Sequence, residues 1–157
     1  MRKLAVWASL GLLAGCQSAI LDDTQLPAAM TNAQYGLEAC HARFAGQMFL
    51  TVREYANCRL AVERQAVATV RLSRTEIFNA HEGRVLTLVA DTEAAPITQQ
   101  RGEAAGQKLI EYTIALYNTV IETHALTEQR RAEARAFLQA YILARASASR
   151  TTVEITR

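Results

Sequence analysis

The sequence has no stretch in which apolar and polar residues alternate on either side of an Asn-Gly or Asp-Gly turn, the pattern that marks a β-hairpin. It also lacks the Gly-x-Ser-x-Gly, Ser-x-x-Lys and His-Glu-x-x-His motifs and any glycine-rich phosphate loop. These absences argue against a sheet protein and against the common hydrolase, zinc-protease and nucleotide-binding classes. We therefore predict no catalytic residue set and no cofactor.

Metal-binding spacing is missing as well. His41, His81 and His124 are the only histidines, and no two of them are four residues apart, the spacing that places two zinc ligands on one helix face. We predict no metal site and interpret all three histidines as surface or half-buried polar residues.

After residue 15 the chain has no excess of positive or negative charge. Arg2 and Lys3 account for the whole formal charge of +2, and the remaining 15 basic residues equal the 15 acidic ones. Without a basic field, the folded part has no electrostatic attraction for nucleic acid. We predict that nucleic acid is not a partner.

What the sequence does contain is a secretory signal. A basic start, Met1-Arg2-Lys3, precedes an apolar run over residues 4–13, which is too short to span a bilayer stably. The run closes with Leu13-Ala14-Gly15-Cys16, and this ending resembles the lipobox of bacterial lipoproteins. The resemblance implies cleavage before Cys16 and acylation of its sulfur and amino group. The alternative is an ordinary cleaved signal in which Cys16 only follows the cleavage point.

The resemblance also implies a location. In lipoproteins an Asp directly after the cysteine favours the inner membrane, and this chain has Gln17. We therefore expect the protein in the cell envelope, anchored by acylated Cys16 to the outer membrane and facing the periplasm, since two acyl chains suffice for stable anchoring. We expect a signal peptide over 1–15, a lipidated flexible tether over 16–30, a helical domain over 31–146 and a polar tail over 147–157.

Cys40 and Cys58 remain in a compartment that oxidises thiols, and their even number favours one disulfide. On one straight helix they would lie about 27 Å apart, whereas a disulfide needs Cα atoms within roughly 7 Å. The chain must therefore reverse between them. Gly46 offers a break, and the capping-box pattern Thr51-Val52-Arg53-Glu54 starts a new helix. We predict a disulfide-linked helical hairpin; two free thiols or a metal pair are the alternatives.

Apolar residues at steps of three and four predict helices over most of the remaining chain. Capping patterns place the first helix start near Thr31 and later starts at Thr98 and Thr127, and Pro96 marks a connection. Residues 73–76 favour a break, although one long helix over 52–91 stays possible. We expect the charged residues of the second helix mostly on its solvent side. The charged residues in question are Arg53, Glu54, Glu63, Arg64 and Arg71. The fold prediction is an all-α bundle of four to five helices.

Met48, Phe49 and Leu50 place three apolar residues in the predicted hairpin connection, where they either tuck under the bundle or contact a partner. The arrangement of Cys40, Cys58 and the following helices resembles uncharacterised secreted helical proteins of alphaproteobacteria. In architecture the chain is also similar to the pilotins of type II secretion, which are lipid-anchored, disulfide-bearing bundles that escort secretin subunits.

The function we predict is that of a lipid-anchored periplasmic helical protein that binds or chaperones another envelope component without catalysis. Two alternatives stay open. One is a peptidoglycan-modifying enzyme or an accessory to one, and the other is a purely structural or stress-related envelope lipoprotein.

Overall fold

A computed structural model describes residues 24–48, 50–72 and 74–155, with side chains as far as residue 146. These stretches contain helices and turns and no strand, so the predicted all-α bundle is confirmed, with five helices. The helices are α1 (Leu26–Phe44), α2 (Val52–Thr69), α3 (Thr75–Glu93), α4 (Gln99–Thr123) and α5 (Glu128–Ile155).

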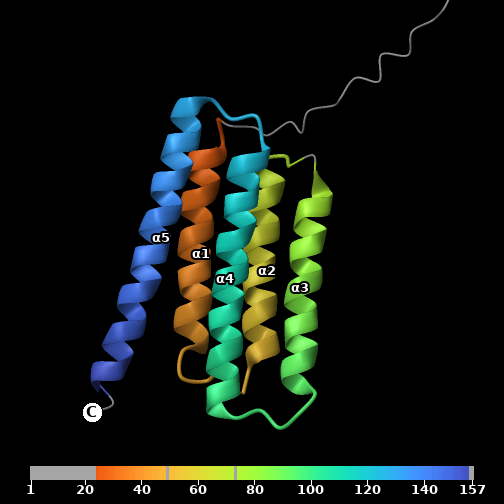
Figure 1. The fold of residues 1–157 in the computed structure, drawn as a ribbon, viewed down its shortest axis with the longest axis vertical. Helices are drawn as coiled ribbons and strands as arrows, with labels where there is room; N and C mark the ends of the chain where they lie inside the picture. The colour runs from red at the N-terminus through yellow and green to blue at the C-terminus, as the bar shows by residue number, and fades with distance from the viewer. Residues whose placement is uncertain (1–23, 49, 73, 156–157) are drawn as a thin grey trace, which may run out of the picture.

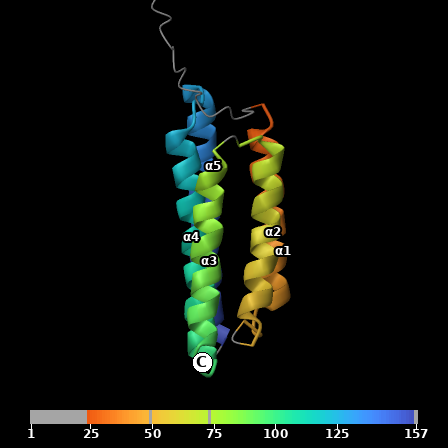
Figure 2. The same cartoon turned by 90° about the vertical axis from the view of Figure 1, so that its right-hand side faces the viewer.

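Successive helices run in opposite directions along the bundle (Figure 1). The start of α1, the α2–α3 turn and the α4–α5 connection lie at one end, which we call the entry end (Figure 1). Viewed from the side, α1 and α2 form one layer, and α3, α4 and α5 form the other (Figure 2). Because helix directions alternate along the chain, α1 and α5 run parallel to each other, and the two helices pack side by side.

The predicted helical hairpin and its disulfide are confirmed. Cys40 on α1 and Cys58 on α2 are bonded, with their Cα atoms 5.9 Å apart. The chain turns between them with Gly46 at φ +74°, a backbone conformation that a side chain would strain. Thr51 precedes α2 as predicted, but its hydroxyl donates to the carbonyl of Gln47 at 3.0 Å and caps no N–H of α2.

Two predicted boundaries were wrong. The first helix begins at Leu26 instead of near Thr31, so residues 26–30, expected in the tether, belong to the bundle. Pro27 is tolerated in the first helical turn because the N–H it lacks would have no partner there, and Leu26 and Met30 are buried. The last helix continues to Ile155, beyond the predicted end at 146, because no glycine or proline interrupts it.

The predicted starts of the last two helices are confirmed. The Thr98 hydroxyl accepts a hydrogen bond from the N–H of Arg101, and the Thr127 hydroxyl accepts one from Arg130, both at 3.3 Å. Pro96 lies between α3 and α4, as expected of a residue that cannot sit inside a helix.

The break between α2 and α3 is also confirmed, and its geometry is that of a Schellman motif. The Leu72 N–H donates to the Val67 carbonyl at 3.2 Å, and the Arg71 N–H donates to the Ala68 carbonyl at 3.3 Å. The motif requires a left-handed residue, and here it is Arg71 at φ +51°. A residue with a Cβ is strained at this position, which usually holds glycine.

We expect Arg71→Gly to raise the free energy of unfolding by about 1 kcal/mol, because glycine removes the left-handed strain and this gain exceeds the added freedom of the unfolded chain. Urea unfolding followed by circular dichroism measures the change, with Arg71→Ala as the control. Alanine keeps the Cβ and should leave stability nearly unchanged. A less stable glycine variant would contradict this explanation of the turn.

Two apolar clusters fill the interior. One lies toward the entry end and includes Leu26, Met30, Val70 and Ile121. The other includes Phe44, Val52 and Val89 toward the opposite end and extends along α3 to Phe78, near the start of that helix. Polar side chains of the middle turns of α2 lie between them, and they form the candidate site.

Candidate functional site: a buried polar cluster

Six polar side chains from four helices meet in the interior, and none is more than 2% exposed. Buried polar groups are stable only when they find hydrogen-bond partners, so the contacts of each member decide what the cluster can do. We call these six residues the buried polar cluster: Tyr55, Arg59 and Glu63 on α2, His81 on α3, Thr113 on α4 and Tyr141 on α5.

Glu63 uses both of its carboxylate oxygens within the cluster. Oε2 lies 2.6 Å from Nε2 of His81, and the Thr113 hydroxyl donates to Oε1. Because a carboxylate oxygen only accepts, Nε2 of His81 carries the shared hydrogen. Nδ1 of His81 is buried and has no hydrogen-bond partner among the described residues. The acid and the base are therefore paired with each other.

Arg59 supplies the positive charge of the cluster. Its Nη1 donates to Tyr55 Oη at 2.9 Å, and its Nη2 donates to Thr113 Oγ1 at 2.6 Å and to Tyr141 Oη at 3.3 Å. Thr113 thereby joins the guanidinium to the Glu63 carboxylate. Burial alone would lower the pKa of Arg59, but the oxygens of Tyr141, Tyr55 and Glu63 outweigh it, so its pKa is raised and the side chain stays charged.

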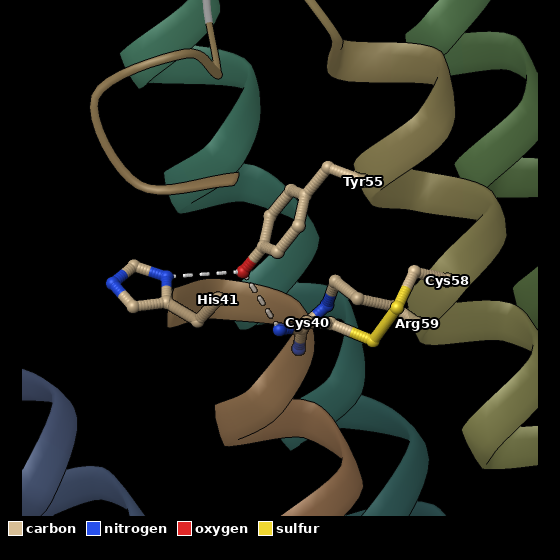
Figure 3. Close-up of a disulfide and its surroundings, with 5 residues drawn as sticks. All are labelled: Cys40, His41, Tyr55, Cys58 and Arg59. Carbon is tan, nitrogen blue, oxygen red and sulfur yellow. Dashed lines mark hydrogen bonds between the residues drawn. A yellow bond between two sulfur atoms is a disulfide. The ribbon is translucent and has the colours of Figure 1, made fainter. Parts of the chain in front are cut away.

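The cluster reaches α1 beside the disulfide (Figure 3). Tyr55 Oη lies 3.3 Å from Nδ1 of His41, which can accept a hydrogen bond from the phenol. Burial raises the pKa of Tyr55, and the charge of Arg59 offsets only part of that rise, so the phenol keeps its proton. Because Arg59 directly follows Cys58, the disulfide holds α1 against the turn of α2 that carries the guanidinium.

Acidification is expected to destabilise the protein through His41. Burial, and then the charges of Arg145 and Arg59, lower the pKa of His41 below its ordinary value of 6.5. The unfolded chain therefore binds a proton more readily than the folded one. The stabilisation from this residue is complete above about pH 6.5 and is lost as the pH falls through the lower pKa of the folded state.

Urea unfolding at several pH values between 7.5 and 5 measures this dependence. The His41→Gln variant removes the titrating group, so its unfolding free energy should fall less steeply over this range. Parallel curves for the two proteins would rule out His41 as a source of the acid sensitivity.

The cluster is closed to solvent, and this limits its chemistry. A Glu–His pair beside a hydroxyl could transfer protons, but none of the three side chains is exposed enough to touch a substrate. A neighbouring cavity between α1, α2 and α4 is apolar and measures about 40 Å³, enough for no more than a few water molecules. We interpret the role of the cluster as structural: its hydrogen bonds hold α2, α3, α4 and α5 in one relative arrangement.

The residues predicted to meet a partner are divided between interior and surface. Met48 is partly buried against α4, where a Cβ added at Gly106 would lie 1.9 Å from its Sδ, so a larger residue at position 106 would force the Met48 side chain to move. Leu50 is 68% exposed. Phe49 and the predicted lipidation residue Cys16 lie outside the described residues.

The sequence reasoning missed the cluster. The prediction that Glu63 lies on the solvent side of α2 was wrong, and so was the interpretation of His81 and His124 as surface or half-buried residues, because they are 0% and 2% exposed. For His41 the half-buried interpretation is confirmed. A signal was present: Arg59 and Glu63 follow the apolar residue Tyr55 at steps of four, which places all three on one face of the helix.

Among the described residues, no group of three or more His, Cys, Asp or Glu side chains is placed to hold a metal ion. Within the same part of the chain, every helix is too short or too polar to cross a membrane. Comparisons with protein-family models, curated proteins and solved structures found no match. The fold and the site define an all-α five-helix bundle with a disulfide-linked hairpin and an ionic interior.

Proposed function

We propose that this chain is a lipid-anchored periplasmic protein that binds or chaperones another component of the cell envelope and catalyses no reaction. The observation that carries the proposal is the sequence Leu13-Ala14-Gly15-Cys16 after a basic and apolar start. Acyl chains on Cys16 would fasten the protein to the outer membrane, with the bundle held in the periplasm.

The closed interior supports a binding role over a catalytic one, because the acid, base and hydroxyl of the buried polar cluster do not reach the surface. The position of the α1–α2 loop supports it too. The loop lies at the opposite end of the bundle from the start of α1 (Figure 1), and the 19 residues of α1 span about 28 Å. A bundle anchored near residue 24 would therefore present Leu50 away from the membrane, where a partner can reach it.

The anchor is tested by Cys16→Ser. We expect the wild-type protein in the membrane fraction with a mass increased by its acyl chains, and the variant in the soluble fraction once its signal is removed. Mass spectrometry of the purified wild-type protein is the direct measurement. An unmodified, soluble wild-type protein would remove both the anchor and the location from the proposal.

The partner is tested by affinity capture of the acylated protein from detergent extracts. We expect one stoichiometric companion, lost with Leu50→Asp because the new charge opposes burial of the loop. Leu86→Asp is the matched control: Leu86 is a second exposed leucine, 47% exposed on α3, and its replacement should leave capture unchanged. Repeated capture with no stoichiometric companion would count against a binding function.

A further inference from the structure

The outer side of the α1–α2 layer carries a shallow groove. In Figure 2 no helix covers this side of the layer. The groove runs along the contact between α1 and α2 toward the entry end and has a volume of about 250 Å³. Its lining contains small, apolar and amide side chains and no charged one: Ala29, Asn32, Ala33, Val62, Gln65, Ala66 and Thr69.

The groove differs from three other contacts between neighbouring helices, α2–α3, α4–α5 and α1–α5, where oppositely charged side chains form ion pairs at the surface. Arg53 and Arg64 of α2 pair with Glu93 and Glu82 of α3. Glu122 of α4 pairs with Arg135 of α5, at 2.8 Å. Glu38 of α1 lies 3.7 Å from Arg145 of α5. The described part of the α1–α2 contact has no such ion pair and is joined by the disulfide instead.

One large exposed side chain, Tyr35, follows the groove residue Asn32 by three residues, about one turn of α1. Tyr35 is 68% exposed on α1, although an aromatic ring is usually buried or held at an interface. Side chains of a helix tilt toward its N-terminus, so the ring of Tyr35 lies at about the height of Asn32. Asn32 lies level with Ala66, because α1 and α2 are antiparallel and Cys40 is joined to Cys58. The ring and the groove are therefore at the same height.

We propose that this outer α1–α2 face binds a second copy of the chain, with Tyr35 of each copy seated in the groove of the other. A twofold axis parallel to the helices keeps every residue at its own height, so it brings each ring level with the opposite groove. The lining of the groove has no charge that would repel its copy, and the amides of Asn32 and Gln65 both donate and accept, so they can pair with themselves. The same axis places both entry ends on one side, which suits two copies anchored in one membrane; this last point alone rests on the proposed lipid anchor.

The test is sedimentation equilibrium of the full chain purified in a density-matched detergent. We expect a monomer–dimer equilibrium whose dissociation constant rises about tenfold or more in Tyr35→Ala, since aromatic anchors of this kind dominate interface energies. Gln65→Arg should weaken the dimer as well, by placing a charge in the groove. The matched controls are Leu86→Ala on α3 and Gln139→Arg on α5, two exposed positions away from this face, and both should dimerise as the wild type does.

A photoreactive phenylalanine derivative at Gln65 provides a second measurement in intact cells. An adduct of twice the protomer mass, absent when the probe is placed at Gln139, would support the proposal. A monomer at every concentration, dissociation constants equal for Tyr35→Ala and wild type, or an adduct only with a different protein would overturn it. A dimer formed by an unacylated chain would keep this inference while removing the anchor, so the two proposals fail separately.

Discussion

Replacement of Glu63 by leucine is expected to lower the free energy of unfolding by about 3–5 kcal/mol, a large fraction of the stability of a small domain. The substitution leaves the buried charge of Arg59 without a compensating carboxylate. It also leaves the Nε2–H of His81 without the acceptor that lies at 2.6 Å. A charge that is buried and unpaired costs far more than the packing of one leucine can return.

A double substitution separates the effect of the buried charges on the unfolding free energy from the effect of side-chain shape. Arg59→Met should be destabilising by a similar amount, because it removes the buried guanidinium whose charge offsets that of the Glu63 carboxylate and whose N–H groups bind Tyr55, Thr113 and Tyr141. The double variant Arg59→Met/Glu63→Leu removes both charges, so its loss should be clearly smaller than the sum of the two single losses. Urea unfolding followed by circular dichroism measures all three proteins. Additive losses would mean that the two side chains stabilise the bundle independently and that no ionic coupling passes through Thr113.

The next residue along the chain provides the control. Arg64 is also paired, with Glu82 at 2.6 Å, but its side chain is 57% exposed. Exposed ion pairs contribute little because water competes with them, and Arg64→Met should therefore change the unfolding free energy by less than about 1 kcal/mol. The contrast between Glu63 and Arg64, adjacent on one helix, tests burial as the cause.

Loss of the disulfide is expected to have the second large effect. In the chain-entropy picture, closing a loop with a sequence separation of 18 stabilises the fold by about 3 kcal/mol. For a domain of this size that corresponds to a melting temperature lower by about 10 °C. The Cys40→Ala/Cys58→Ala variant and the wild type under reducing conditions should both show this decrease. A reductant should have no further effect on the double variant.

A labelling experiment tests the pairing itself. The single variant Cys40→Ser should expose one thiol, at Cys58, to alkylation in the unfolded chain, whereas the untreated wild type should give none at either position. Labelling of both cysteines in the untreated wild type would show that the hairpin is not linked. Cysteines held only 5.9 Å apart between their Cα atoms should not remain reduced in an oxidising compartment.

The local features of the fold were predictable because they depend on residues close together in sequence. The hydroxyls of Thr98 and Thr127 accept from N–H groups three residues ahead, and Pro96 interrupts a helix by its own geometry. The helix ends that were wrong depend on distant contacts. Leu26 and Met30 carry no strong helix signal, and they join α1 because the other helices bury them.

By itself, the sequence determined the helical class, the hairpin and the pairing of Cys40 with Cys58, since periodicity, caps and the length of a helix are short-range constraints. Only the tertiary structure decided which polar side chains lie inside. Arg59 and Glu63 can be buried because His81, Thr113 and Tyr141 arrive from three other helices to satisfy them. A charged residue at a helix position where an apolar residue is expected does not reveal its partners in the sequence, because hydrogen bonds between helices depend on how the helices pack.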